Sequence, residues 1–199
     1  MIANSSLGSN FQELLDFKLG SYSISLWIND GLMTIFFLLV GLEIKREILE
    51  GELSSFKNAT LPIFAALGGM LVPAAIFYFF NQGSKYENGW GIPMATDIAF
   101  SLAIISMLGK RVPVSIKIFL TALAIVDDLG AIVVIAIFYT EKIETTYLLL
   151  CGLVLFILII LNFFKVKRHI FYLIPGVFLW YFMHHSGIHA TIAGVLLAF

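Results

Sequence analysis

The apolar residues of this chain occur in long unbroken segments rather than at the spacing of an amphipathic helix. Residues 59–80 hold 22 positions without a charge, and residues 145–164 hold 20 more. About 20 apolar residues in a helix cross the ~30 Å hydrocarbon core of a bilayer. The pattern predicts seven membrane spans, with these approximate bounds: 24–44, 59–80, 88–109, 114–140, 145–164, 169–183 and 186–199.

The overall composition supports this fold class. Hydrophobic residues make up 60% of the chain and charged residues 13%, about half the charged share of a typical soluble domain. We therefore predict an all-α polytopic membrane protein, with one transmembrane core over residues 24–199 and an extracytoplasmic segment over residues 1–23. A net charge of −1 gives no reason to expect a nucleic-acid partner. The single Cys151 has no second cysteine with which to form an intrachain disulfide.

The basic residues predict the orientation of the spans. Nine of the twelve follow the first, third or fifth span: Lys45, Arg46, Lys57, Lys110, Arg111, Lys117, Lys165, Lys167 and Arg168. Lys18, Lys85 and Lys142 lie singly in the alternate segments. Since cytoplasmic loops carry the excess of Lys and Arg, we expect the first, third and fifth spans to end in the cytoplasm.

Three carboxylates interrupt these apolar segments at similar depth. Asp127 and Asp128 are adjacent near the middle of the fourth predicted span, and Asp97 lies near the middle of the third. A charged side chain at the bilayer centre costs roughly 2.5–3.5 kcal/mol on translocon scales. Acids at one level in neighbouring spans therefore indicate a single functional site.

The third predicted span also carries signs of a break. Pro93 and Thr96 come just before Asp97, and proline removes a backbone donor and clashes with the preceding turn. A break there frees carbonyl oxygens in mid-membrane, as in the discontinuous helices of transporters. Pro93 by itself is also compatible with a simple kink, but Thr96 and Asp97 beside it favour an ion site. Carboxylate, hydroxyl and carbonyl oxygens suit a hard cation. Groups that hold either a cation or protons couple the two by competition, which is antiport in outline.

Two other interpretations fit the residues less well. An intramembrane aspartyl protease also uses two membrane aspartates, but it needs a Gly-x-Gly-Asp context that is absent around Asp127 and Asp128. His185 and His189 are four residues apart and could share a helix face as a zinc pair. No acidic third ligand lies nearby in sequence, so an interfacial position for both histidines is favoured.

Four segments resemble the NhaA-type Na⁺/H⁺ antiporters: residues 26–47, 95–104, 111–140 and 186–199. The ATDIAF and DDLGA motifs within them are highly specific. The resemblance implies a secondary active transporter, not an enzyme, in the inner membrane of a bacterium. It would expel Na⁺ or Li⁺ in exchange for protons, respond to pH and need no cofactor.

The resemblance also implies roles for individual residues. Asp128 corresponds to the central ligand of Na⁺ and of the proton, and Asp127 to the second acid of that pair. Thr96 with Asp97 corresponds to the break where helices cross. The charged cluster Glu43, Arg46 and Glu47, together with His189, corresponds to residues linked to pH regulation. For both the cluster and the histidine, an ordinary interfacial position remains the alternative.

The resemblance covers only part of the family pattern. The family has about twelve spans, and this chain resembles the second to the eighth, so we expect a form truncated at both ends. A lysine that pairs with the first of the two adjacent aspartates belongs to the part that is not matched. The outer hairpin used for dimerisation corresponds, in shortened form, to residues 17–23, which makes a homodimer an expectation. The alternative to transport is a membrane remnant that folds but moves no ion.

Overall fold

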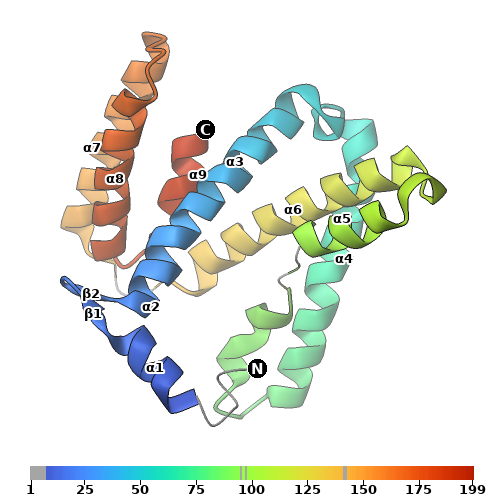
Figure 1. Cartoon of the computed structure of the whole chain (residues 1–199), viewed down its shortest axis with the longest axis horizontal. Helices are drawn as coiled ribbons and strands as arrows, with labels where there is room; N and C mark the ends of the chain where they lie inside the picture. The colour runs from blue at the N-terminus through green and yellow to red at the C-terminus, as the bar shows by residue number, and fades with distance from the viewer. Residues whose placement is uncertain (1–7, 95, 97, 141–142) are drawn as a thin grey trace. The chain divides into compact units, whose positions relative to one another are not determined.

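A computed structural model describes residues 8–94, 96, 98–140 and 143–199 of the chain (Figure 1). Helices dominate this part of the chain, and the only strands within it form one short hairpin. The fold divides into two compact units. The first contains Met1–Gly41 and Glu141–Phe199, and the second contains Leu42–Thr140. Each unit is described separately below.

Long apolar helices confirm the prediction of an α-helical membrane protein. Within the described residues, four are long and apolar enough to span a bilayer: Ile24–Glu50, Lys57–Asn81, Val114–Phe138 and Thr145–Phe163. A shorter apolar helix covers Ile170–His185. The total of seven spans stays a prediction, because residues 88–109 and 186–199 contain only shorter helices.

The first unit begins with an amphipathic helix and a hairpin. α1 (Gly8–Asp16) is followed by β1 (Lys18–Leu19) and β2 (Tyr22–Ser23), which pair antiparallel. Gly20 turns the chain between them with φ +73°, a conformation that glycine adopts without steric cost. The Ser23 hydroxyl then accepts a hydrogen bond from the Leu26 amide at 3.2 Å. This cap starts the first long helix directly after the hairpin.

That long helix has three parts in continuous succession. α2 (Ile24–Leu26) passes into η2 (Trp27–Leu32), a stretch of π-helix, and then into α3 (Met33–Glu50). A π-helical turn shifts the backbone hydrogen bonds from i→i+4 to i→i+5 and often marks a functional position. Asp30 lies within this π-helical stretch and contacts residues of another helix, α8 (Ile170–His185).

α3 and α9 (Ile192–Ala198) pack closely within the first unit because small residues face each other. A Cβ on Gly194 would collide with the carbonyl of Thr34 and lie 2.9 Å from the Leu38 amide nitrogen. A Cβ on Gly41 would lie 2.7 Å from the Cβ of Ala198. Small residues at such crossings let two membrane helices bring their backbones together.

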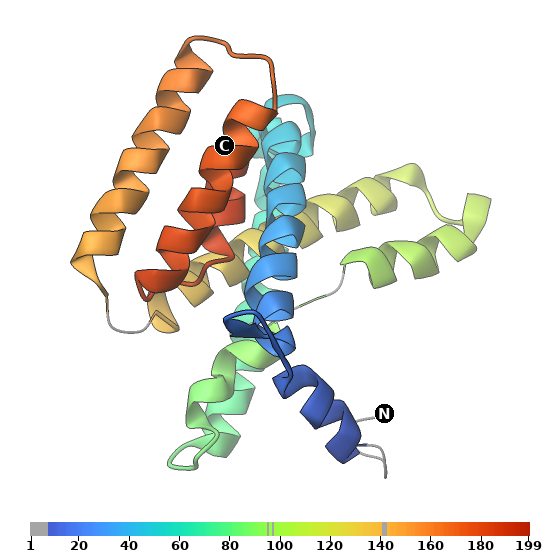
Figure 2. The same ribbon diagram turned by 60° about the vertical axis from the view of Figure 1, so that its left-hand side comes forward.

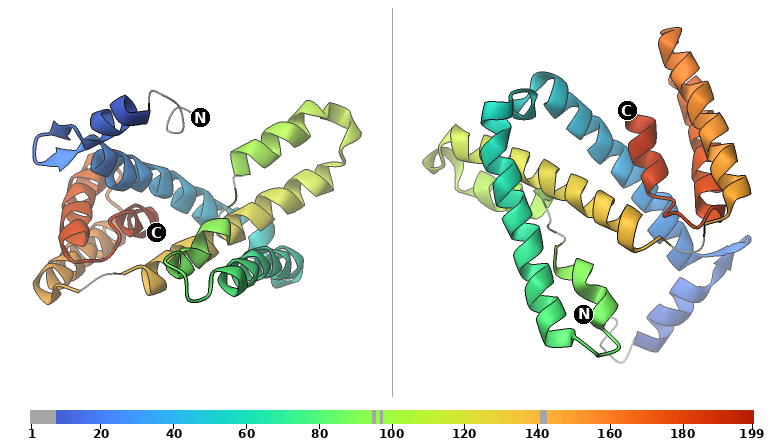
Figure 3. Two further views of the ribbon diagram at one scale, coloured as in Figure 1. Left: turned by 90° about the horizontal axis from the view of Figure 1, so that it is seen from below. Right: turned by 180° about the vertical axis from the view of Figure 1, so that it is seen from behind.

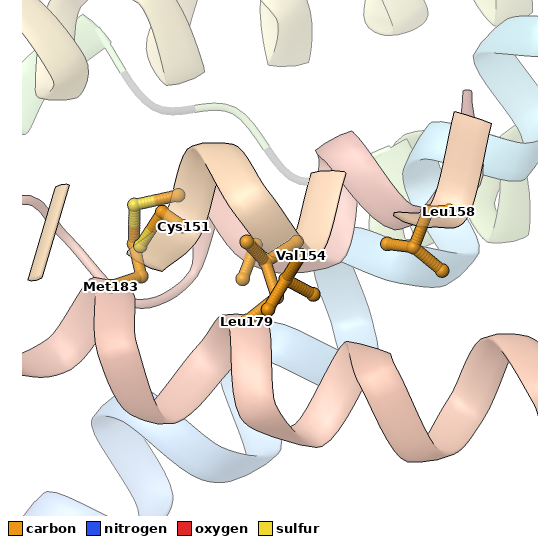
Figure 4. Close-up of a cluster of buried hydrophobic side chains, with 6 residues drawn as sticks. Cys151, Val154, Leu158, Leu179 and Met183 are labelled. Carbon is orange, nitrogen blue, oxygen red and sulfur yellow. The ribbon is translucent and has the colours of Figure 1, made fainter. Parts of the chain in front are cut away.

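α7 (Thr145–Phe163) and α8 (Ile170–His185) lie side by side in the same unit (Figure 2). Cys151, Val154 and Leu158 recur on one face of α7 and meet Leu179 and Met183 of α8 (Figure 4). All five side chains are buried. The three-to-four-residue spacing places them on one stripe of each helix, so most of the other apolar side chains of these helices point outward, as expected of helices that face lipid.

The second unit is built on α4 (Phe56–Asn81) and α6 (Val114–Phe138). Short elements connect them: η3 (Glu52–Ser54) and η5 (Gly109–Arg111) are 3₁₀ turns, η4 (Glu87–Met94) is a longer 3₁₀ helix and α5 (Ile98–Met107) is an α-helix. η4 lies along the C-terminal part of α4 (Figure 3).

A small core joins α4, η4 and α6. Ala66, Met70 and Ala74 of α4 surround the buried Met94 at the end of η4, with Val126 of α6 packed against them. Gly130 of α6 leaves room for Met70, because a Cβ there would collide with the methionine sulfur. This core fixes the end of η4 beside the middle of α6.

The close crossing of α3 and α9 gives a first prediction. Gly194→Ala should destabilise the protein by about 1–3 kcal/mol, because the added methyl group meets backbone atoms that cannot rotate away. Thermal unfolding in detergent measures the change. Gly152→Ala is the matched control, since nothing lies within 4 Å of its Cβ position. Alanine there should be neutral or stabilising by about 1 kcal/mol. Equal shifts in the two variants would contradict the close approach.

Candidate functional site

The two adjacent aspartates lie in the middle of α6, far from either helix end. Asp127 is buried, with 6% of its surface exposed. Asp128 is half-buried, and its Oδ2 atom is shielded from solvent. Successive residues of an α-helix point about 100° apart, so the two carboxylates leave the helix in different directions. A backbone at mid-helix is fully hydrogen-bonded, and these side chains therefore bring the polar chemistry to this level of α6.

Thr96 supplies a hydrogen bond to the buried carboxylate. Its hydroxyl donates to Oδ2 of Asp127. Thr96 lies between η4 and α5 and belongs to neither helix. The two residues are 31 positions apart in the sequence, and the contact forms because Met94, two residues before Thr96, is anchored in the core shared with α4 and α6.

The four residues predicted for the ion site thus have different outcomes. Thr96 and Asp127 are in contact, and Asp128 adjoins Asp127 on α6. Asp97 lies outside the described residues. Residues 88–109 divide between η4 and α5, and Thr96 lies outside both helices. That these two elements form one discontinuous membrane-spanning helix stays a prediction.

The residues predicted for pH regulation fall in two places. Glu43, Arg46 and Glu47 lie near the C-terminal end of α3. Arg46 forms an ion pair with Glu43 one turn away, and their side chains are 65% and 41% exposed, so the pair is solvated. Gly51 has no Cβ, and its absence leaves space for the Glu47 carboxylate. These contacts are those of a charged helix end, and they leave the predicted regulatory role untested.

His189 lies between α8 and α9 and is half-buried. Its carbonyl accepts the Ile192 amide at 3.1 Å, at the start of α9. His185, the other member of the zinc pair considered from the sequence, contacts the Tyr181 carbonyl through Nδ1 at 2.8 Å. Among the residues that the structure describes, no group of three His, Cys, Asp or Glu side chains could hold a metal ion.

A second polar contact within the helices, between Asp30 and His184, was not predicted from the sequence. In the first unit, Asp30 Oδ2 and His184 Nδ1 share a hydrogen bond of 2.7 Å. Trp180 donates its indole N–H to the Asp30 carbonyl at 3.0 Å, and the Thr34 hydroxyl donates to the same oxygen. A signal was present, because Asp30 is an acid within an apolar span. Its partner lies 154 residues away, which no local pattern could reveal.

Tyr139 was also missed, although it contacts the segment that leads to Thr96. Its hydroxyl donates to the Asn88 carbonyl at 2.8 Å and accepts from the Gly91 amide at 3.1 Å. A tyrosine at the end of an apolar helix is typical of an interfacial aromatic residue. Its sequence position therefore gave no sign of the hydrogen bonds to Asn88 and Gly91.

Among the described residues, the polar groups brought together at Asp127 are the carboxylates of Asp127 and Asp128 and the hydroxyl of Thr96. Two carboxylates can bind a hard cation or take up protons. The threonine hydroxyl can donate one hydrogen bond and still offer lone pairs as an acceptor. The arrangement therefore suits reversible binding of a small cation or of protons.

Comparisons with known proteins agree with this chemistry. The family described as Na⁺/H⁺ antiporter 1 matches residues 1–199. The chain is 57% identical over 199 residues to the Na⁺/H⁺ antiporter NhaA of Flavobacterium psychrophilum, covering all of this chain and 52% of that protein. It is 58% identical over 197 residues to NhaA 1 of Flavobacterium johnsoniae, covering 99% of the chain and 52% of that relative.

A third relative, NhaA of Cytophaga hutchinsonii, is 55% identical over 199 residues, which is all of this chain and 51% of that protein. The chain therefore spans about half the length of the curated relatives that it matches. These relatives are named as antiporters, which are secondary transporters and not enzymes.

The contact between Thr96 and Asp127 gives a second prediction. Thr96→Val keeps the shape of the side chain but leaves the buried Asp127 carboxylate without this donor. We expect a loss of about 1–3 kcal/mol in the free energy of unfolding. Thr96→Ser, which retains the hydroxyl, is the matched control and should lose clearly less.

A double-mutant cycle with Asp127→Leu isolates the interaction, because leucine offers no acceptor to the Thr96 hydroxyl. If the hydroxyl acts through this carboxylate, the two single effects will not add, and the coupling energy will be at least about 0.5 kcal/mol. Strict additivity in thermal unfolding measurements would show that Thr96 stabilises the protein by some other contact.

Proposed function

The chain belongs to the Na⁺/H⁺ antiporter 1 family, and on that premise we propose that it exchanges Na⁺ or Li⁺ for protons across the inner membrane of a bacterium. The observation that carries the proposal is the hydrogen bond from Thr96 to the buried Asp127 in the middle of α6. A carboxylate with a hydroxyl partner at mid-helix has little structural purpose in an apolar helix, and a polar group there by default indicates an ion or proton pathway.

Competition at Asp127 and Asp128 couples the two ions. A cation is held best when both carboxylates are ionised, because one then faces the cation and the other adds a nearby negative charge. Protons remove that charge and release the cation. Cation and protons therefore occupy the site alternately, and each crosses the membrane in the opposite direction from the other.

Thr96 supports both states of this site. With Asp127 ionised, the Thr96 hydroxyl donates to its Oδ2 atom and directs oxygen lone pairs away from the carboxylate. These lone pairs are available to a cation. With Asp127 protonated, rotation of the hydroxyl allows it to accept instead of donate. Asp97, next in sequence, is proposed as a further oxygen ligand on the strength of the family resemblance.

Regulation and assembly are proposed for surfaces away from this site. We propose that Glu43, Arg46, Glu47 and His189 take part in a response to pH, on the strength of the family resemblance. The hairpin of β1 and β2 is proposed to take part in a homodimer. Lipid surrounds the apolar helices.

Reconstitution tests the proposed exchange and gives a third prediction. Proteoliposomes containing the chain, loaded with a proton-sensitive dye at alkaline pH, should move protons when Na⁺ is added. Asp128→Asn removes one ionisable ligand and should lower the initial rate at least about tenfold, toward that of protein-free vesicles. Asp16→Asn, on the exposed face of α1, is the matched control and should retain the rate.

The alternative outcome is equally informative. A chain that inserts into the vesicles and unfolds cooperatively on heating, but moves no protons with Na⁺ or Li⁺, would favour a membrane protein that folds without transporting. Equal rates in the unmodified chain and in Asp128→Asn would show that exchange does not depend on the carboxylates of α6.

A further inference from the structure

Tyr139 is the C-cap residue of α6, and its hydroxyl group forms hydrogen bonds to the beginning of η4. Its backbone amide bonds to the Ile135 carbonyl at 3.2 Å, so the residue still belongs to the end of the helix. Its hydroxyl donates to the Asn88 carbonyl at 2.8 Å and accepts from the Gly91 amide at 3.1 Å. Asn88 and Gly91 lie three residues apart in the first part of η4, and the phenol thus uses both its donor and an acceptor position on one turn.

The residues next to this contact fit closely against the tyrosine ring and hydroxyl. A Cβ on Gly91 would lie 2.8 Å from the Tyr139 hydroxyl oxygen and 3.1 Å from Cε2, so only glycine permits the approach. Trp90 packs edge-on against Phe138 with ring centroids 5.0 Å apart, and its ring is tilted against that of Tyr139 at 6.2 Å. The aromatic contacts hold the ring, and the two hydrogen bonds fix η4 against it.

The other end of the same segment meets the candidate ion site. Met94 is buried in the core of α4 and α6, and Thr96 donates to Asp127. Along α6, Asp127 and Tyr139 are about 18 Å apart at 1.5 Å per residue. Within η4, Asn88 and Met94 are about 12 Å apart at the 3₁₀ rise of about 2 Å per residue. Since Asn88 and Gly91 meet Tyr139 and Thr96 meets Asp127, the segment runs in the opposite direction to α6.

We propose that the Tyr139 hydroxyl is a positioning group for the cation site: it holds the start of η4 at the end of α6 and, together with Met94, sets the level at which Thr96 meets Asp127. This inference rests on the proposed function, because it assigns Tyr139 a role in cation binding at that site. Tyr139 acts through η4 and is at the far end of α6 from the carboxylates, so it is not itself a ligand.

The distinction between ring and hydroxyl makes the proposal testable. Tyr139→Phe keeps the aromatic contacts with Trp90 but removes both hydrogen bonds to η4. The start of η4 is then held to α6 by ring contacts alone, while Met94 still anchors its end. We expect the looser segment to bring Thr96 to Asp127 for a smaller share of the time. The Na⁺ concentration at half-saturation should rise roughly threefold to tenfold, the range expected for one or two neutral hydrogen bonds. The maximal response should stay the same, because the ligands themselves are unchanged.

Hydrogen–deuterium exchange on the whole chain in lipid nanodiscs measures both effects. The exchange rate of peptides covering residues 88–94 shows how firmly the Tyr139 hydroxyl holds η4. Their protection as a function of added Na⁺ gives the Na⁺ concentration at half-saturation. Gly91→Ala is a second variant that breaks the same contact by crowding the hydroxyl. Tyr86→Phe is the matched control, since Tyr86 is 59% exposed just before η4. Thermal unfolding midpoints of all the variants show whether any change is global.

The expected result is faster exchange over residues 88–94 in Tyr139→Phe and Gly91→Ala, a raised half-saturation for Na⁺, and neither change in Tyr86→Phe. Unchanged exchange in both Tyr139→Phe and Gly91→Ala would show that the Tyr139 hydroxyl does not hold η4. Faster exchange with an unchanged half-saturation would overturn the link to the cation site. If the unmodified chain shows no response to Na⁺, the proposed function fails and the positioning role fails with it, while the exchange rates still decide whether the hydroxyl holds η4.

Discussion

The central constraint on this protein is that polar groups within an apolar helix bundle must find partners among its own residues. Bilayer hydrocarbon offers no hydrogen bonds, and each unsatisfied group costs several kcal/mol. Asp127 meets this constraint through Thr96, which is available because the chain leaves helical geometry between η4 and α5. An irregular segment and a buried carboxylate thus satisfy each other. The pairing also brings together two oxygen ligands, of which the carboxylate can take up a proton and the hydroxyl can donate or accept a hydrogen bond.

The same constraint explains the second polar contact, in the other unit. η2 is π-helical, and the carbonyl of Asp30 receives donors from Trp180 and Thr34. The Asp30 carboxylate is matched by His184. These contacts tie the first long helix to α8 with groups that would be unfavourable in lipid on their own. In each unit an acid within an apolar helix, Asp127 or Asp30, therefore hydrogen-bonds a residue from a distant part of the sequence.

Close backbone packing supplies the rest of the stability. Helices in lipid gain little from the hydrophobic effect against one another, so they associate through van der Waals contact at small residues. Gly194 lies against Thr34, and Gly130 lies against Met70. The second of these contacts sits one turn beyond the aspartates of α6 and helps to seat Met94. Packing at a glycine thus contributes to the position of the candidate site, because Met94 in turn places Thr96.

The sequence by itself determined the class of protein, the long apolar helices, the place of Asp127 and Asp128 at mid-helix and the family. These features follow from composition and local order, because about 20 apolar residues must form a helix in a bilayer and an acid among them is visible at once. Only the tertiary structure decided which residues serve those acids. Thr96 with Asp127, His184 with Asp30 and Tyr139 with η4 all join positions far apart in the sequence. Hydropathy describes each segment alone and carries no information on how a helix is rotated or which helices lie beside it. The rotation of a helix and the identity of its neighbours decide which residue becomes the partner of each polar group.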